Sequence, residues 1–299
     1  MQQLARFGVA GNPPHFWESK YSKERANSPE WLDSIGLDAL EIQCTYGIRM
    51  PDERAKMFLE NSKKYNIALS IHAPYYINIG VENQKTLDNS VSEIQKAIVL
   101  CKKLDTKKII FHPGGIPKSR EESCNKAIKT LKRVEADLIS NDVYLYPEIG
   151  GKCGQLGSLE DIIFFCKNVK NVYPCLDLAH LHARTNGTLY TKQDFLNVFK
   201  KVENELGNDA LHKIHIHMYP VDFGTGGEKA HKAFDDLKDN TQLILGSDHT
   251  EERYTPRYEP FIEAITEMKL YPTIICEAKD SQDVGALAMK KYYKGLNHN

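Results

Sequence analysis

The sequence lacks any long uninterrupted apolar segment, which bears on where the protein resides. Among its 299 residues, no apolar run approaches the roughly 18 residues that a membrane-spanning helix requires. Residues 1–6 have neither the apolar stretch nor the cleavage signature of a secretory signal. The seven cysteines are scattered, odd in number and free of Cys-x-x-Cys pairs, which argues against disulfides and thiolate zinc sites. We therefore expect a cytoplasmic protein with no membrane partner.

An excess of positive charge is also missing, which excludes a wholly basic nucleic-acid-binding chain. The 39 Lys and Arg residues are balanced by 40 Asp and Glu residues, for a formal net charge of −1. With this balance, any DNA site must be a local patch that is supported by metal charge. No low-complexity linker or shift of composition divides the chain. We therefore expect a single domain that spans residues 1–299.

Short apolar runs alternate with longer segments of helical period from one end of the chain to the other. One of these segments places Leu87, Val91, Ile94 and Ile98 three or four residues apart, as in a helix that packs on a sheet. Eight strand–helix units in this order predict an α/β fold, a closed (β/α)8 TIM barrel. The predicted strands are 6–10, 39–43, 68–72, 108–112, 143–148, 172–177, 213–218 and 273–277, and the predicted helices include 52–65, 120–139, 158–167, 192–206 and 282–293.

One connection is longer than the repeat requires. Residues 219–256 contain a glycine-rich piece at 224–227 and an apolar piece at 243–245. Connections of this length usually have a function or carry structure of their own. We expect an elaborated loop over the barrel mouth, with 243–245 as an extra strand.

Polar side chains of metal-binding types end most of the predicted strands. In a TIM barrel the carboxyl ends of all strands meet at one rim, where the active sites of barrel enzymes lie. A lone carboxylate in such a place is commonly a helix cap, but a whole set of His, Asp and Glu donors suits zinc, manganese or iron. The number of donors predicts two or three ions, bridged by carboxylates such as Glu148. The candidates are His72, His112, Glu148, Asp177, His180, His215, His217 and Glu277.

These segments resemble the endonuclease IV family (AP endonuclease family 2), within the sugar-isomerase-like barrels. The matching segments are 70–78 (Ser-Ile-His-Ala-Pro-Tyr-Tyr-Ile-Asn), 111–114, 147–148, 175–180 and 214–216, in order along almost the whole chain. The resemblance implies a zinc-dependent hydrolase of DNA repair, of the deoxyribonuclease IV type. Such an enzyme binds damaged double-stranded DNA and cleaves the phosphodiester 5′ to an abasic site, leaving a 3′-hydroxyl. We expect it to act as a monomer.

The resemblance also implies a site for three zinc ions, with manganese or iron as alternatives. It assigns Glu148, Glu277 and Asp177 to catalysis, because Glu148 would bridge ions and position the attacking hydroxide while the other two tune it. The implied ligands are His72, His112 and Glu148 for one ion, Glu148, Asp177, His215 and Glu277 for the second, and His180 for the third.

The remaining ligands of the third ion are where the sequence departs from the family. The family supplies an Asp-x-His from the loop after the seventh strand, and the sequence has none there. A histidine two residues beyond His215 resembles the ultraviolet-damage endonucleases, as do residues 277–280. We expect His217 and His231 to complete this site, with Asp248 and His249 as the alternative pair.

Two further residues are candidates for substrate contact. Tyr75, close to His72, would stack against the exposed sugar–base stack of the DNA, with ordinary packing at the rim as the alternative. Arg49 would bind a phosphate, although single arginines in loops are commonly only solvated. The alternative for the whole chain is a sugar isomerase or epimerase with a single metal ion. That reaction needs only about four ligands around its ion, so the number of ligands discriminates between the two. A barrel that binds without turnover is a third alternative.

Overall fold

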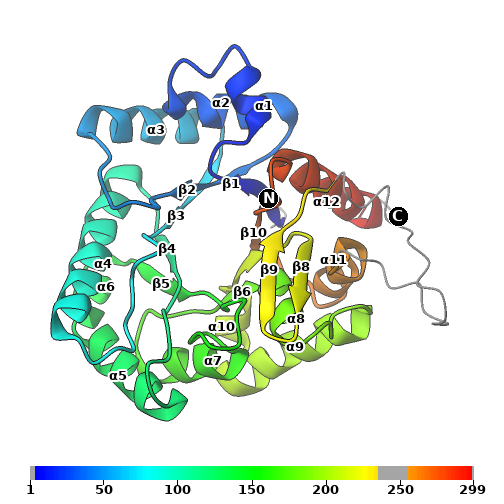
Figure 1. Cartoon of the computed structure of the whole chain (residues 1–299). Coiled ribbons are helices and arrows are strands. Elements are labelled where there is room, and N and C mark those ends of the chain that lie inside the picture. The colour runs from blue at the N-terminus through cyan, green and yellow to red at the C-terminus, as the bar shows by residue number, and fades with distance from the viewer. Residues whose placement is uncertain (1–3, 235–254, 298–299) are drawn as a thin grey trace.

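The chain forms a closed ring of parallel strands, as the computed structural model of residues 4–234 and 255–297 shows (Figure 1). The order of neighbours is β5-β4-β3-β2-β1-β10-β7-β6. Isolated parallel bridges, Leu145 with Val172 and Glu148 with Cys175, join the two ends of this order and close the barrel. The predicted TIM barrel is thus confirmed. The strands are β1 Arg6–Ala10, β2 Ala39–Gln43, β3 Ala68–His72, β4 Lys108–Phe111, β5 Tyr144–Pro147, β6 Cys175–Asp177, β7 His215–His217 and β10 Thr273–Cys276.

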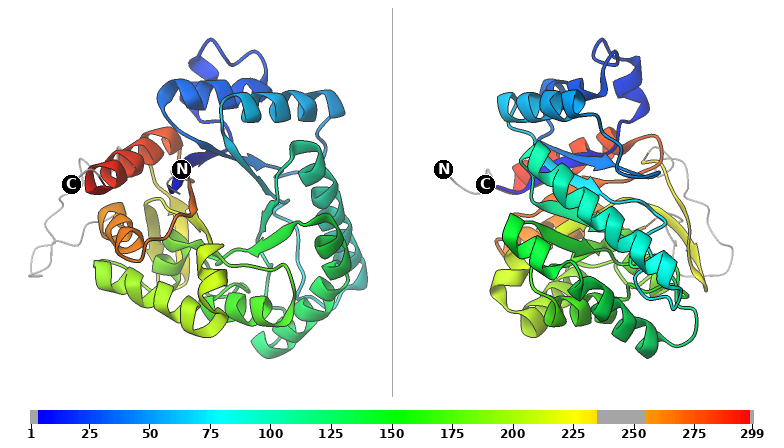
Figure 2. Two further views of the ribbon diagram at one scale, coloured as in Figure 1. Left: turned by 180° about the vertical axis from the view of Figure 1, so that it is seen from behind. Right: turned by 90° about the vertical axis from the view of Figure 1, so that its left-hand side faces the viewer.

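Helices surround the barrel on all sides in the views of Figures 1 and 2. They pack by their apolar stripes, as in α4, where residues such as Ile94, Ala97 and Cys101 are buried. Ser158 and Asp161 form a capping box at the start of α7. The helices are α1 Pro14–Glu18, η1 Arg25–Asn27, α2 Ser28–Ile35, α3 Asp52–Lys64, α4 Gln84–Leu104, α5 Arg120–Lys132, α6 Glu135–Asn141, α7 Leu159–Asn168, α8 Leu178–Arg184, α9 Lys192–Leu206, α10 Asn208–His212, α11 Tyr258–Glu267 and α12 Gln282–Asn297. Within the described residues, no helix is long and apolar enough to cross a membrane.

The structure differs from the predicted elements in two places. The predicted helix 120–139 is interrupted between α5 and α6, because the backbone N–H groups of Arg133 and Val134 bond to carbonyls only three residues back. The long connection 219–256 begins with a hairpin of β8 Val221–Gly224 and β9 Gly227–His231. The strand expected at 243–245 lies outside the described residues.

The register between neighbouring strands determines how deep each side chain lies in the barrel. His217 pairs with Asp177 of β6 and with Ile275 of β10, whereas His215 pairs with Cys175 and Thr273. The side chains of His215 and His217 point to the same face, but they lie one layer apart along the strand. Only the layer of His217 therefore reaches the end of the barrel where the strands terminate.

Candidate metal centre

Six strand ends converge on one buried cluster of imidazoles and carboxylates. His72, Asp177 and His217 are the last residues of β3, β6 and β7. His112, Glu148 and Glu277 directly follow β4, β5 and β10. The cluster is buried except for parts of the side chains of His112 and Glu277, which are 35% and 13% exposed. The structure thus brings together most of the residues that the sequence singled out at this rim.

The first group of donors is His72, His112 and Glu148. The Nε2 atoms of His72 and His112 lie 3.0 and 3.5 Å from Glu148 Oε2. All three donor atoms are within 4.8 Å of one another, so one ion could contact them together. This is the set that the resemblance assigns to one zinc ion.

The second group consists of Glu148, Asp177, His217 and Glu277. His217 Nδ1 lies 3.3 Å from Glu148 Oε1, 3.7 Å from Asp177 Oδ2 and 3.8 Å from Glu277 Oε1. Glu148 therefore turns one oxygen toward this group and the other toward His72 and His112. This is the arrangement expected of a carboxylate that bridges two ions.

His215 is not part of the second group, contrary to the expectation from the sequence. Its ring lies one layer deeper, where its Nε2 atom is 2.9 Å from Glu41 Oε2. The reason is the strand register, which places His217 and not His215 beside Asp177. His217 was expected in the third group, and the structure places it in the second.

The third group consists of His180, Glu228 and His231, of which sequence reasoning missed Glu228. His180 Nε2 and His231 Nε2 lie 3.3 and 3.2 Å from the two oxygens of Glu228. Residues three apart in a regular strand point to opposite faces. Here β9 has one extra residue, because Asp222 pairs with Ala230 while the next residue, Phe223, pairs with Glu228. This bulge turns Glu228 and His231 toward the same side. The alternative pair, Asp248 and His249, lies outside the described residues.

Backbone carbonyls fix the orientation of three of these rings. The Nδ1 atoms of His72, His180 and His231 each lie 2.9 Å from a backbone oxygen, of Ala73, Ile149 and Glu277 respectively. When the Nδ1–H group donates to the carbonyl, the neutral ring keeps a free lone pair on Nε2. In all three rings this Nε2 atom faces a carboxylate oxygen at 3.0 to 3.3 Å. Two lone pairs so close repel each other unless a proton or a metal ion lies between them, so these donor sets can hold metal ions.

Neighbouring side chains hold the carboxylates in place. Asp177 Oδ1 accepts from the backbone N–H of His180 at the start of α8, and Tyr219 donates its hydroxyl to Asp177 Oδ2 at 2.9 Å. Gln43 Nε2 donates to Glu277 Oε1 at 3.3 Å. These hydrogen bonds fix the positions of the carboxylate oxygens of Asp177 and Glu277.

The electrostatics of the buried cluster also favour cations. Burial opposes the charged form of Glu148, but the nearby histidines outweigh it and hold its pKa well below the ordinary value. Burial, followed by the charge of Glu148, raises the pKa of Glu277. Burial lowers the pKa of His72, yet its contact with Glu148 raises it to about 9 overall. The negative charge of the buried carboxylates is thus balanced only by protons on the histidines or by metal ions.

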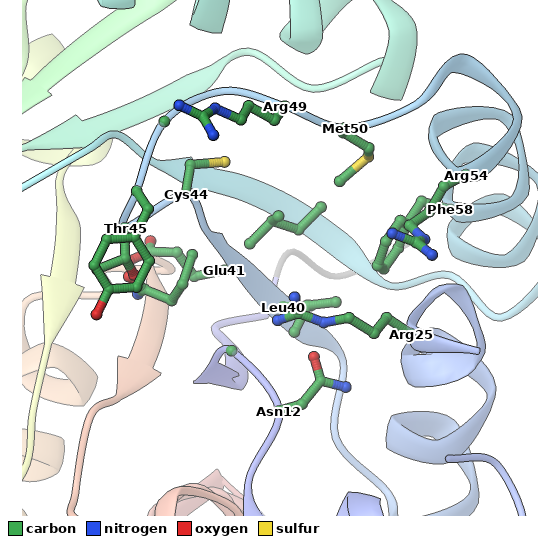
Figure 3. A pocket seen from close by; sticks show the side chains of 15 residues that line it. Asn12, Arg25, Leu40, Glu41, Cys44, Thr45, Arg49, Met50, Arg54 and Phe58 are labelled. Carbon is green, nitrogen blue, oxygen red and sulfur yellow. The ribbon is translucent and has the colours of Figure 1, made fainter. Parts of the chain in front are cut away.

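A pocket of about 430 Å³ lies beside β2 and the loop that follows it, and the buried Glu41 is one of its lining residues (Figure 3). Arg25, Arg49 and Arg54 lie in its wall together with Glu41, and Arg49 is outside the three donor groups. The second predicted contact residue, Tyr75, is 61% exposed. Its ring meets those of Tyr46 and Tyr76 edge to face, at centroid distances of 6.0 and 5.7 Å. Exposed aromatic rings thus lie on the loops that follow β2 and β3, and arginines line the pocket that contains Glu41.

Comparisons with known proteins extend over most of the chain. The family model described as "Xylose isomerase-like TIM barrel" matches residues 29–296. An uncharacterized protein of Methanocaldococcus jannaschii is 27% identical over 289 residues, covering 96% of each chain. The "Probable endonuclease 4" of Aquifex aeolicus is 27% identical over 180 residues. That match covers 58% of this chain and 62% of the Aquifex protein, less than two thirds of its length.

Solved structures with the same fold include both enzyme types that were considered from the sequence. A D-tagatose 3-epimerase-like protein matches with a TM-score of 0.68 and 21% identity, covering 98% of each chain. Endonuclease IV from Thermus thermophilus matches with a TM-score of 0.64 and 17% identity, covering 97% of this chain and 99% of that one. At these identities the structures establish the fold alone, while the endonuclease 4 relatives confirm the resemblance seen in the sequence. The match over residues 29–296 shows that this chain belongs to the xylose isomerase-like TIM barrel family.

Proposed function

We propose that this protein is a zinc-dependent phosphodiesterase, a DNA-repair endonuclease that cuts damaged double-stranded DNA on the 5′ side of an abasic site. The observation that carries this proposal is the presence of three adjoining donor groups, two of which share Glu148. Sites with two or more neighbouring ions are typical of enzymes that hydrolyse phosphodiesters. The relatives named endonuclease 4 support the same activity.

The donors beyond the second group are what favour a phosphodiesterase over an epimerase. Glu148, Asp177, His217 and Glu277 alone would suffice for the single ion of a sugar epimerase. That reaction gives no role to His72, His180 or His231. Yet each of these rings is fixed through Nδ1 so that Nε2 points into the site. A chain that needed one ion would have no reason to orient these rings in this way.

The described residues assign a role to each part of the reaction. Divalent ions in the three groups would lower the pKa of water and neutralise the phosphodiester and its leaving oxygen. Glu148 would keep two groups at a fixed separation, since its two oxygens face different donors. Asp177 and Glu277 would orient the attacking water from their positions fixed by Tyr219 and Gln43.

Residues around the mouth would bind the DNA. Arg49, with Arg25 and Arg54 in the same pocket, would bind backbone phosphates. Tyr75 would stack on a base or sugar beside the lesion, since most of its ring is exposed. This local patch is what a chain with a net charge of −1 needs in order to bind DNA. We propose that the protein acts as a monomer.

A sugar isomerase or epimerase with one metal ion is the second candidate. It is favoured by the set of two Glu, one Asp and one His in the second group and by the fold of the epimerase-like protein. The two candidates differ in what they require of the first and third groups. An epimerase would lose little activity when His112 of the first group or His180 of the third group is removed.

The experiment is cleavage of a duplex oligonucleotide that carries one abasic analogue, with protein loaded with zinc or manganese. We expect a nick directly 5′ to the lesion in the wild type. The nick should be lost in Glu148→Gln and reduced by about 100-fold or more in His112→Ala and His180→Ala, each of which removes a donor from one group. His212→Ala, an exposed histidine on α10, is the matched control and should cut normally.

Two results would contradict the proposal. One is the absence of any nick when metal analysis shows full occupancy. The other is an unchanged activity of His112→Ala and His180→Ala together with epimerisation of a ketohexose such as tagatose. The second result would establish the single-ion reaction, which depends on the second group alone.

A further inference from the structure

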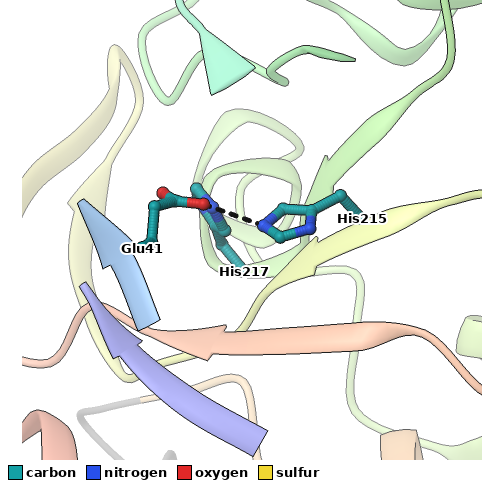
Figure 4. Close-up of side chains that lie close together, drawn as sticks. All are labelled: Glu41, His215 and His217. Carbon is teal, nitrogen blue, oxygen red and sulfur yellow. Dashed lines mark hydrogen bonds and ion pairs between the residues drawn. The ribbon is translucent and has the colours of Figure 1, made fainter. Parts of the chain in front are cut away.

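Beneath the metal centre lies a buried carboxylate that none of the three donor groups uses. Glu41 comes from β2, and its carboxylate faces the rings of His215 and His217 from β7 (Figure 4). All three side chains are fully buried. A buried carboxylate without partners is costly, so its contacts must account for its charge.

Each oxygen of Glu41 faces a different set of partners. Oε2 accepts a hydrogen bond from Ser70 Oγ at 2.9 Å and lies 2.9 Å from His215 Nε2. Oε1 lies 3.1 Å from His217 Nε2. Neither of these last two atoms forms a hydrogen bond in the described part of the chain, so they are close to each other but not aligned as donor and acceptor. The two atoms can therefore be satisfied only by each other or by a shared cation.

The other nitrogen of His217 faces the metal centre. Nδ1 is the atom surrounded by Glu148, Asp177 and Glu277 at 3.3 to 3.8 Å. A neutral imidazole has one N–H and one lone pair, so a proton on Nε2 leaves the lone pair on Nδ1. Glu148 Oε1, 3.3 Å from Nδ1, could instead accept a proton from that nitrogen. An ion in the second group would exclude this proton from Nδ1, and the Glu41 carboxylate would then accept the proton of Nε2.

We propose that Glu41 is a positioning residue, which keeps the proton of His217 on Nε2 and aims its Nδ1 lone pair at the ion of the second group. His215 and Ser70 would in turn hold the Glu41 carboxylate by donating to Oε2. Histidines that bind metals commonly donate their other N–H to a carboxylate, which fixes the ring and makes it a better ligand. Glu41 thus belongs to the metal centre although it does not touch the reacting atoms.

An ion bound directly by Glu41, His215 and His217 is the other arrangement that these distances allow. With the second group also occupied, it would require His217 to bind ions through both nitrogens, and the neutral ring would have to lose its one N–H proton. It would also place a cation beside an oxygen that already accepts from Ser70. The geometry therefore favours the hydrogen-bonded arrangement.

The inference rests on the metal centre of the proposed function, but its test depends on no substrate. Zinc affinity and stoichiometry would be measured by competition with a chelator and by elemental analysis, in the wild type and in Glu41→Gln. We expect the same number of ions at saturation and an affinity for the ion at His217 that is weaker by about 10- to 100-fold. Glu93→Gln, which removes a buried carboxylate away from the metal centre, is the matched control.

A second measurement covers the case in which Glu41→Gln does not fold. NMR of protein with ¹⁵N-labelled histidine reports which ring nitrogen carries the proton, and zinc-loaded wild type should show His217 protonated on Nε2. Ser70→Ala, which keeps the carboxylate and removes one donor, should weaken the same ion by a smaller factor.

The possible outcomes separate this inference from the proposed function. Unchanged affinity in Glu41→Gln, or a His217 ring protonated on Nδ1, would overturn the inference and leave the metal centre intact. The loss of one whole ion at saturation would overturn it in favour of a direct ligand. A wild type that binds no metal would instead refute the proposed function.

Discussion

A single methyl group added at Gly151 should disable the third donor group and leave the other two intact. A Cβ atom at this position would lie 2.5 Å from Glu228 Oε2 and 2.6 Å from His180 Cδ2. Ordinary van der Waals contact begins near 3.4 Å. Gly151 itself cannot move away easily, because its carbonyl accepts from the Glu228 N–H. The side chains of His180 and Glu228 must therefore move away from residue 151.

The size of this displacement sets the expected effect. Moving the two side chains to normal contact requires a shift on the order of 1 Å, and a misplacement of this size costs about 100-fold in rate. Crowding of this kind also lowers the free energy of unfolding by about 1–3 kcal/mol. For Gly151→Ala we thus expect a folded protein that has lost one of its ions and most of its nicking activity.

The assay compares Gly151→Ala with Gly154→Ala in the same loop, where an added Cβ has no atom within 4 Å. Metal content, nicking of abasic duplex DNA and thermal unfolding would be measured in parallel for both variants. The control should resemble the wild type in all three. If Gly151→Ala retains every ion and full activity, the third group is not a metal site of this enzyme, and the argument from its geometry fails.

Three further predictions concern pH, substrate contact and metal removal. Burial lowers the pKa of His182 to about 4, below the unfolded value of about 6.5. The folded state therefore binds fewer protons, so the free energy of unfolding should fall as the pH is lowered from about 6.5 to about 4. The loss should be at most roughly 3 kcal/mol, at 1.36 kcal/mol per pKa unit. In urea unfolding, His182→Gln should show a smaller loss of this free energy over the same pH range. Tyr75→Ala should change the free energy of unfolding by less than about 0.5 kcal/mol but weaken binding of abasic DNA by about 1–3 kcal/mol, measured by fluorescence anisotropy. Removing the ions with a chelator should lower the melting temperature, since ions present at about 1,000 times their Kd contribute about 4 kcal/mol; an unchanged melting temperature would argue against resident metals.

The order of elements and the composition of the rim could be predicted from the sequence. Apolar runs of strand length alternate with helix-period segments, and this pattern predicts parallel strands whose carboxyl ends share one rim. His72, His112, Glu148, Asp177 and Glu277 stand at those ends in the sequence, so their convergence follows from the topology alone. The position of His180 followed in the same way, because it lies in the short helix α8 directly after β6.

The depth and facing of several side chains were decided only by the tertiary structure. A period of two assigns His215 and His217 to one face, but the register with β6 and β10 determines which of them lies at the mouth. Glu228 joins His231 only because of a bulge in β9, which the local sequence does not reveal. Glu41 is the single charged residue of β2, and its contact with two histidines of β7 depends on closure of the barrel. The sequence thus determined most of the donors at the rim, whereas pairing between strands decided whether His215 or His217 reaches it and which donors meet.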